Sequence, residues 1–309
     1  MQGRPAQGLY VLGWVLSGVG FVLLFVAAQA GPPLGGVLLM GSLLLLLAGL
    51  SSAAGYQIVA RSTRPAPLFR GASPLLLFGV QFFLVNIISL VLDVLGVGGS
   101  ALTPVTIFIA AVVLVFGYVS VVFLFGLRTH VLALRDFRIP IPLASGRLLG
   151  DAAVGLGVGL LTALGVGLWS GVLSLLLGAQ PPDIVPTMGS AADVILVVLA
   201  TCLLIPFGEE LFFRGYNVPA WLDDVGARSA LVRSAAFFAL VHVINVLTPQ
   251  STQGAVDGLK QAAIEVLVIA PVGLVLGWLF VRRGLVASIA GHAAFNSFAV
   301  LSLLLVSSR

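Results

Sequence analysis

Two adjacent glutamates close a long apolar run, in the string GEELFFR that starts at Gly208. Neighbouring helical residues point about 100° apart, so the carboxylates of Glu209 and Glu210 face different directions. Arg214 follows Glu210 by four residues in the favourable acid-before-base order, and a bidentate ion pair would hold Glu210 ionised and fixed. Glu209 is then left without a cation of its own, which suits a general base. The alternative is a helix end whose charges are solvated at the membrane interface.

Two histidines and an asparagine follow in later apolar runs. His242 lies on one helical face with Phe238, about 18 Å into its run at 1.5 Å per residue. His292 and Asn296 are spaced i, i+4 and share one stripe about 12 Å into the last run. These types can position water, accept a proton or donate to a developing oxyanion. The alternatives are a packing histidine and an interhelical hydrogen-bond pair. The third histidine, His130, lies in a basic connection.

The composition requires a membrane around these residues. Of the 309 residues, 60% are hydrophobic and 8% are charged, whereas soluble domains carry roughly 25% charged residues. Backbone groups in hydrocarbon must be satisfied within the segment, so the spans should be helices. We therefore expect an all-α integral membrane protein. Its single cysteine, Cys202, lies in an apolar run, which excludes an internal disulfide.

Nine apolar runs are long enough to cross a bilayer, which takes about 20 residues. They are Leu9–Ala30, Leu34–Ala60, Leu75–Val94, Val105–Leu127, Leu148–Leu177, Ala191–Phe213, Ala230–Leu247, Ala262–Val281 and Leu285–Val306. The first run resembles a secretory signal in its Ala-Gln-Ala ending but exceeds the usual apolar length. We expect nine spans, or eight if that run is removed.

The basic residues predict the topology. With a cytoplasmic N-terminus, thirteen arginines fall inside and only Lys260 and Arg309 fall outside, a strong positive-inside bias. The thirteen are Arg4, Arg61, Arg64, Arg70, Arg128, Arg135, Arg138, Arg147, Arg214, Arg228, Arg233, Arg282 and Arg283. Residues 128–147 mix basic and apolar types and should lie on the membrane surface. They end an N-terminal four-helix region, 1–147, and precede a C-terminal core, 148–309.

The fifth span is long enough to be tilted or broken at its glycines. It contains Gly155, Gly157 and Gly159 in alternation. Because no strand precedes this string, it is not a dinucleotide-binding loop. Close helix packing through small residues is the better interpretation.

Three motifs, in this order on separate spans, resemble those of the CPBP (CAAX protease and bacteriocin-processing, or Abi) family of intramembrane endopeptidases. The motifs are Glu-Glu-x-x-x-Arg at 209–214, Phe-x-x-x-His at 238–242 and His-x-x-x-Asn at 292–296. The family includes the CAAX prenyl endopeptidases of the Ras-converting type, and the resemblance covers roughly residues 148–309. It implies that Glu209 and His242 activate a water and that His292 and Asn296 stabilise the oxyanion. Glu210, Arg214 and Phe238 would then support the site.

The sequence allows two hypotheses about a metal cofactor. A metal-free glutamate mechanism is favoured, because there is no His-Glu-x-x-His helix and Asn296 would be a poor ligand. The alternative is zinc, held by Glu209, His242 and His292 in an open three-ligand site.

Two other functions compete with a peptidase. One is a catalytically silent scaffold of the same superfamily, although such members would be expected to lose the glutamates. The other is a proton-coupled transporter, which would use Glu265 in the eighth span. For the peptidase, we expect a bacterial inner (plasma) membrane location, with the site in the cytoplasmic half of the bilayer. Its partners would be the lipid bilayer and a protein or peptide substrate, lipid-modified ones included, and no nucleic acid.

Overall fold

The computed structural model is all-helical across the residues that it describes, which are 6–30, 33–63, 69–97, 102–140, 146–182, 185–247 and 255–307. Within these ranges, nine helices are long and apolar enough to cross a membrane, which confirms the predicted number of spans. Arg4, Arg64, Arg309 and residues 141–145 of the expected surface segment lie outside the described residues.

The N-terminal region holds four long helices and two short ones. They are α1 (Gln7–Gln29), α2 (Leu34–Ser62), α3 (Pro74–Val94), α4 (Pro104–Val122), the π-helical η1 (Phe123–Leu127) and the 3₁₀-helical η2 (Leu134–Phe137). Side-chain hydrogen bonds cap the N-termini of two helices near the site, α4 and α6. Thr103 and Thr106 form a capping box before α4, and Ser190 and Asp193 form one before α6.

The C-terminal region begins with the unbroken helix α5 (Gly146–Leu177). The sixth span is built in five parts: α6 (Ala191–Val198), π-helical η3 (Leu199–Leu204), α7 (Ile205–Phe212), π-helical η4 (Phe213–Asn217) and α8 (Val218–Val225). The chain ends with α9 (Ala227–His242), 3₁₀-helical η5 (Val243–Leu247), α10 (Ala255–Arg283) and α11 (Leu285–Ser307).

The predicted end of the sixth span at Phe213 is wrong. The helix continues to Val225 and stops at Gly226, whose φ of 78° breaks it. Arg214 is therefore fully buried and does not belong to an inner connection, as the charge count had assumed. An arginine can lie at this depth only because buried partners satisfy its charge.

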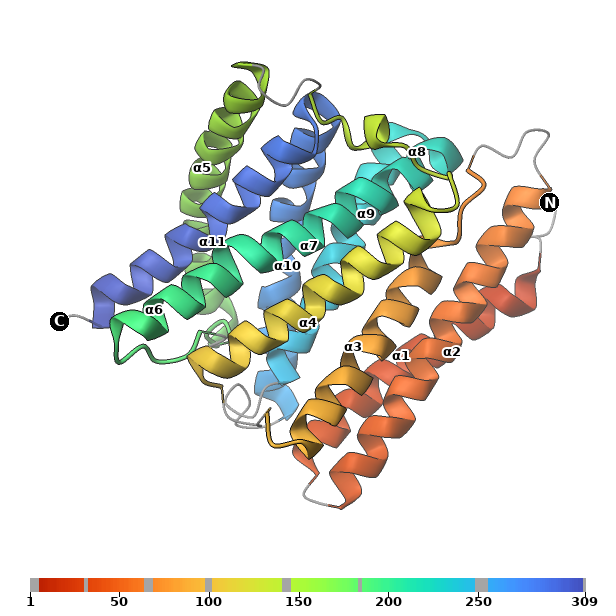
Figure 1. Ribbon diagram of the computed structural model, residues 1–309. Helices are drawn as coiled ribbons and strands as arrows, with labels where there is room; N and C mark the ends of the chain where they lie inside the picture. The colour runs from red at the N-terminus through yellow and green to blue at the C-terminus, as the bar shows by residue number, and fades with distance from the viewer. Residues whose placement is uncertain are drawn as a thin grey trace.

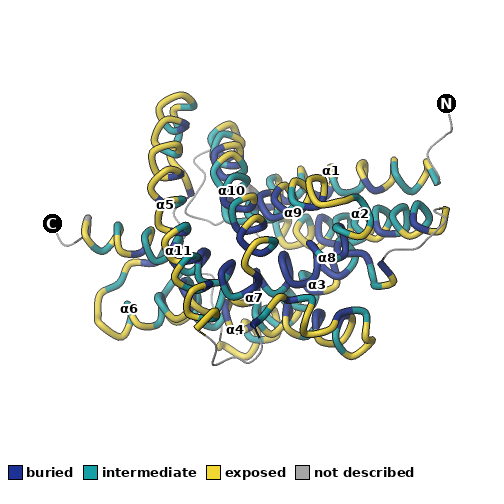
Figure 2. Tube along the Cα trace, turned by 90° about the horizontal axis from the view of Figure 1, so that it is seen from above, coloured by how far each residue is buried: buried dark blue, intermediate teal, exposed yellow. Residues whose placement is uncertain are grey.

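Helix α7 lies in the centre of the bundle, between α4 and α11, with α9 and α10 behind it (Figure 1). An aromatic core surrounds it, in which Phe212, Phe213, Tyr216, Phe238 and Phe280 are at most 1% exposed. Helices α1 and α2 form a hairpin at one flank, and α5 lies at the other with much of its surface exposed (Figure 2). Through α4, the N-terminal region directly supports the helix that carries both glutamates.

Helix α5 packs closely on α11 through two of its three alternating glycines. A side chain at Gly155 would collide with the carbonyl of Ala287, and one at Gly159 would collide with that of Gly291. The small-residue interpretation is thus confirmed for these two positions. It is wrong for Gly157, which has no atom within 4 Å of an added Cβ. The helix shows no break at these glycines.

One carbonyl in α10 shows how the bundle satisfies its backbone. Pro271 lies inside this helix and has no N–H, so the carbonyl of Leu267 loses its usual helical donor. The indole of Trp169 in α5 donates to that carbonyl at 3.2 Å. Two spans are thereby joined at a point where the helix alone would leave an acceptor unpaired.

Several arginine-bearing segments meet at one end of the bundle, where α8, the start of α5 and the α10–α11 junction lie (Figure 1). Arg61 at the end of α2 pairs with Asp224 at 2.7 Å, and Arg138 donates to the carbonyl of Val281. This clustering is what a positive-inside topology requires. The cytoplasmic assignment of this end, and the division of the chain at 147, stay predictions.

Candidate active site

Glu210 is the centre of a buried polar network with Arg214, Ser288 and His292, called here the Glu210 network. Its Oε1 accepts from Arg214 Nη1 at 2.8 Å and from His292 Nδ1 at 2.9 Å, and its Oε2 accepts from the Ser288 hydroxyl. Glu210 is 0% exposed. Three donors on one carboxylate hold it ionised and immobile.

The expected ion pair of Glu210 and Arg214 is present, but the prediction that it is bidentate is wrong. Only Nη1 of Arg214 contacts the carboxylate, and the Ser288 hydroxyl donates to the other oxygen. Nη2 instead donates to the carbonyl of Gly273 in α10 at 3.1 Å. The guanidinium group therefore ties α7 to α10, while the carboxylate ties α7 to α11.

The ring of Phe238 contacts both the arginine and the two histidines. The guanidinium carbon of Arg214 lies 4.3 Å from the centre of its ring, a cation–π contact. The ring centres of His242 and His292 lie 4.4 and 5.8 Å from that of Phe238. The Phe238 carbonyl accepts from His242 Nδ1 at 2.7 Å. Phe238 therefore contacts both imidazoles, and its supporting role stays a prediction.

The hydrogen bonds of the two histidines define which nitrogen is left to react. A carbonyl oxygen can only accept, so Nδ1 of His242 carries its proton. Nδ1 of His292 likewise donates to the carboxylate of Glu210. In the neutral imidazoles, each Nε2 is then an acceptor.

Glu209 faces both of these Nε2 atoms. Its Oε2 lies 3.9 Å from Nε2 of His242 and 3.8 Å from Nε2 of His292; these three residues are called the Glu209 cluster. Both gaps exceed a direct hydrogen bond and suit a bridging water. Oε2 has no hydrogen-bond partner within the described part of the chain. Because Glu209 is only 7% exposed, the alternative of solvated charges at a helix end is wrong.

Asn296 forms a hydrogen bond to the sixth span at a residue that precedes the glutamates. Its side-chain nitrogen donates to the carbonyl of Thr201 in η3 at 2.7 Å. That carbonyl lacks helical donors, because the N–H of Ile205 bonds to Ala200 and Pro206 has no N–H. The π-helical turn and the proline together create the acceptor that Asn296 uses. One hydrogen of the Asn296 amide is thereby engaged.

Sequence reasoning missed Ser288, although a signal was present. Ser288, His292 and Asn296 follow each other at intervals of four residues and share one stripe of α11. A lone serine in an apolar span is common, so the spacing alone did not separate Ser288 from a packing residue. His130 is exposed and belongs to neither the network nor the cluster.

Glu265 belongs to the surroundings of this site. Its Oε1 accepts from Asn245 Nδ2 at 2.9 Å, and it is 7% exposed. Asn245 lies three residues after His242, with which Glu265 interacts electrostatically. The residue that a transporter would use best thus lies next to the histidine of the Glu209 cluster.

The donor set matches a zinc site in chemistry but not in spacing. Glu209, His242 and His292 are suitable ligands, with each histidine oriented through Nδ1 as metal ligands commonly are. Tetrahedral zinc with bonds of about 2.0–2.1 Å places its donors about 3.3 Å apart, less than the 3.8 and 3.9 Å found here. Across the described residues, no three His, Cys, Asp or Glu side chains are gathered into a metal-binding group.

One protein-family model matches the segment of the chain that holds this site. Residues 191–298 match the model of a family described as type II CAAX prenyl endopeptidase Rce1-like. The match covers about a third of the chain and includes both the Glu210 network and the Glu209 cluster. It confirms the resemblance to the CPBP family. Among curated proteins and solved structures, nothing matches the chain.

The nine apolar spans and the matched segment together define a class, a multi-pass membrane protein of protease type. More specifically, residues 191–298 are similar to CAAX prenyl endopeptidases.

Proposed function

We propose that this protein is an intramembrane endopeptidase in which Glu209 activates the attacking water. The observation that carries the proposal is the Glu209 cluster: one carboxylate oxygen faced by two imidazole nitrogens, 3.8 and 3.9 Å away, inside the bundle. A water between these groups would have the Glu209 carboxylate as its base and the two oriented imidazoles as its other partners.

The first half of the reaction uses Glu209 and His242. Glu209 takes a proton from the water as its oxygen forms a bond to the carbonyl carbon of the scissile peptide. His242, held through Nδ1 by the Phe238 carbonyl, accepts from the water at Nε2 and positions it. The protonated Glu209 then returns the proton to the leaving nitrogen as the C–N bond breaks, giving a carboxylic acid and an amine.

His292 and Asn296 serve the oxyanion of the tetrahedral intermediate. To donate, His292 must carry a proton on Nε2, and the carboxylate of Glu210 against Nδ1 provides the counter-charge for that imidazolium. Asn296 has a second amide hydrogen beyond the one given to Thr201. Donors aimed where negative charge develops lower the barrier more than contacts made only to the substrate.

The substrate proposed is a peptide bond in a membrane-associated protein or peptide. The matched family is described by its action on prenylated CAAX ends, so lipid-modified substrates are included. The bilayer is the second partner, and no nucleic acid is involved. The arginine-bearing end of the bundle would face the cytoplasm, which places the cluster in the cytoplasmic half of a cell membrane.

The test compares membrane proteins from cells that carry the wild-type chain and the Glu209→Gln variant. Peptide termini are mapped by mass spectrometry. The expected result is a set of trimmed termini that disappears in Glu209→Gln and persists in Asp257→Asn, which changes a half-exposed carboxylate at the start of α10.

Identical termini in wild-type and Glu209→Gln cells, with both proteins present in the membrane, would favour the catalytically silent scaffold. A proton-coupled uptake that depends on Glu265 in proteoliposomes would favour the transporter.

A further inference from the structure

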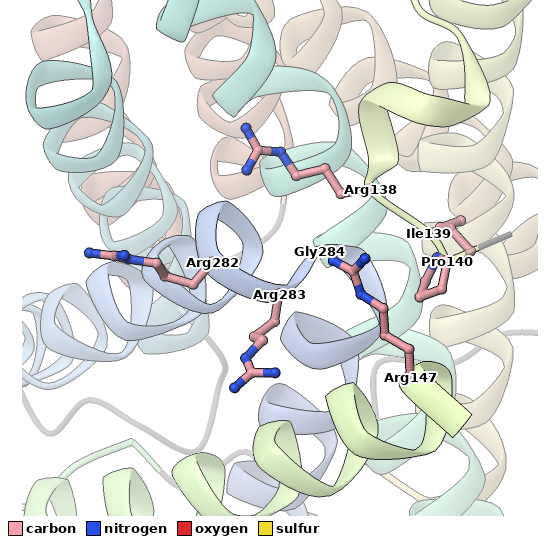
Figure 3. A pocket seen from close by; sticks show the side chains of 7 residues that line it. All are labelled: Arg138, Ile139, Pro140, Arg147, Arg282, Arg283 and Gly284. Carbon is pink, nitrogen blue, oxygen red and sulfur yellow. The ribbon is translucent and has the colours of Figure 1, made fainter. Parts of the chain in front are cut away.

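A pocket of about 370 Å³ opens at the arginine-rich end of the bundle, between the stretch after η2, the first turn of α5 and the α10–α11 junction. Figure 3 shows the side chains of Arg282 and Arg283 pointing out of it in different directions, so their charges do not converge on one ligand. The pocket therefore adds no site of its own.

Tyr118 in α4 lies on the side of α7 from which Glu209 projects. Phe212 and Phe213 follow Glu209 by three and four residues and therefore share its face of the helix. The Tyr118 ring contacts both of them, with its centre 5.1 Å from that of Phe212 and 6.1 Å from that of Phe213. Gly208, directly before Glu209, leaves no side chain between this ring and α7, since an added Cβ would lie 3.4 Å from the ring.

The hydroxyl of Tyr118 has no hydrogen-bond partner among the described residues, although the residue is only 3% exposed. A buried tyrosine hydroxyl usually finds a partner. Tyr118 interacts electrostatically with the carboxylate of Glu209. Oε2 of Glu209 likewise accepts no hydrogen bond from the part of the chain that the structure describes. A donor without an acceptor and an acceptor without a donor thus lie on the same side of α7.

We propose that the Tyr118 hydroxyl donates to the Glu209 carboxylate through one water and so positions the base toward the two histidines. A carboxylate that accepts this hydrogen bond keeps further lone pairs for the attacking water, and a bridging water spans two groups that do not touch. Tyr118 lies outside residues 191–298, the segment that matches the endopeptidase family, so the N-terminal region completes the site. The effect on cleavage rests on the proposed function, whereas the contact between Tyr118 and Glu209 does not.

The contact is tested by infrared difference spectroscopy on the purified full-length chain. The carboxyl band of Glu209 is identified as the band that Glu209→Gln removes. Tyr118→Phe deletes only the hydroxyl and should shift this band, because the carboxyl group loses a hydrogen bond. The matched control is Tyr216→Phe, whose hydroxyl donates to the carbonyl of Ala72 at 2.9 Å and whose ring also stacks on Phe212; here the band should not move. An unshifted band in Tyr118→Phe overturns the proposal.

The second measurement is steady-state cleavage of a synthetic peptide that spans a terminus trimmed by the wild-type chain in cells. Tyr118→Phe should lower kcat about tenfold, the effect of one hydrogen bond to a charged group, and leave KM and the unfolding temperature close to those of wild type. Tyr216→Phe should do the reverse, lowering the unfolding temperature and keeping kcat. Equal kcat values in the two variants overturn the positioning role. A shifted band in a chain that cleaves nothing supports the contact and overturns the peptidase.

Discussion

The Glu210 network and the Glu209 cluster contain neighbouring glutamates but differ in how their carboxylates are satisfied. Both oxygens of Glu210 accept hydrogen bonds, and three other side chains hold it in place. Oε2 of Glu209 faces two imidazoles at distances too long for a direct bond. A fully satisfied carboxylate stabilises a structure, whereas an unsatisfied one is available to a substrate or a water. His292 belongs to both groups and connects them.

The largest expected effect comes from removing the base of the Glu209 cluster. Glu209→Gln keeps the size of the side chain and removes its capacity to take a proton. Cleavage by purified protein should fall by about 10³–10⁴-fold, the upper part of the range for general acid–base catalysis. The unfolding temperature should stay close to that of wild type. A variant that keeps a tenth of the activity would contradict the assignment of Glu209 as the base.

Glu210→Gln should act mainly on stability. It leaves the fully buried Arg214 without its carboxylate, and breaking a buried pair in this way costs about 3–5 kcal/mol. The free energy of unfolding in mild detergent measures this, with Glu209→Gln as the matched control one residue away. Equal stability of the two variants would remove the distinction between the network and the cluster.

Ser288→Ala tests the network more gently. It deletes a hydrogen bond to an ionised carboxylate, so a loss of about 1.5–3 kcal/mol in unfolding free energy is expected. Ser297→Ala in the same helix is the control, because its hydroxyl only returns to the carbonyl of Ala293. If both substitutions have the same effect, Ser288 contributes nothing particular to Glu210.

Gly159→Leu tests whether helix packing positions the site. Its side chain would meet the backbone of Gly291, next to His292, and overpacking of this kind costs about 1–3 kcal/mol. Gly157→Leu, two residues away, has open space and should be close to neutral. Unfolding temperature and cleavage rate are measured for both. Equal behaviour would show that α11 is not held through this contact.

The smallest expected effect is that of chelation. Cleavage should persist after exhaustive treatment with a chelator, and elemental analysis should find no stoichiometric zinc. Loss of activity that zinc restores and magnesium does not would assign zinc to Glu209, His242 and His292 instead.

Local patterns predicted a large part of this structure. Apolar run length indicated nine spans because the bilayer fixes how long a span must be. The four-residue spacing of Glu210 and Arg214 predicted their pairing, since both partners lie on one helix. Glu209, His242 and His292 were predicted as a group from their motifs, and the structure brings them together. Their catalytic roles stay proposals.

Contacts between distant segments were not predictable in the same way. The hydrogen bonds from Ser288 to Glu210 and from Arg214 to the carbonyl of Gly273 depend on how α7, α10 and α11 pack. The sequence of a single span does not contain that information. The end of the sixth span was placed too early, because Arg214 is of a type that usually lies among headgroups and its buried partners come from other helices. The hydrogen bond from Asn245 to Glu265 likewise connects two different spans.

The two π-helical turns of the sixth span have a further consequence. They lie on either side of α7, which carries both glutamates. Along the chain, η3 connects α6 to α7, and η4 connects α7 to α8. A π turn holds more residues than an α turn and changes the rotational phase of the next helical segment. The direction in which Glu209 points is therefore set independently of which sides of α6 and α8 face the lipid. Loss of a single residue from η3 would rotate the pair by about 100° and present the wrong carboxylate to His242.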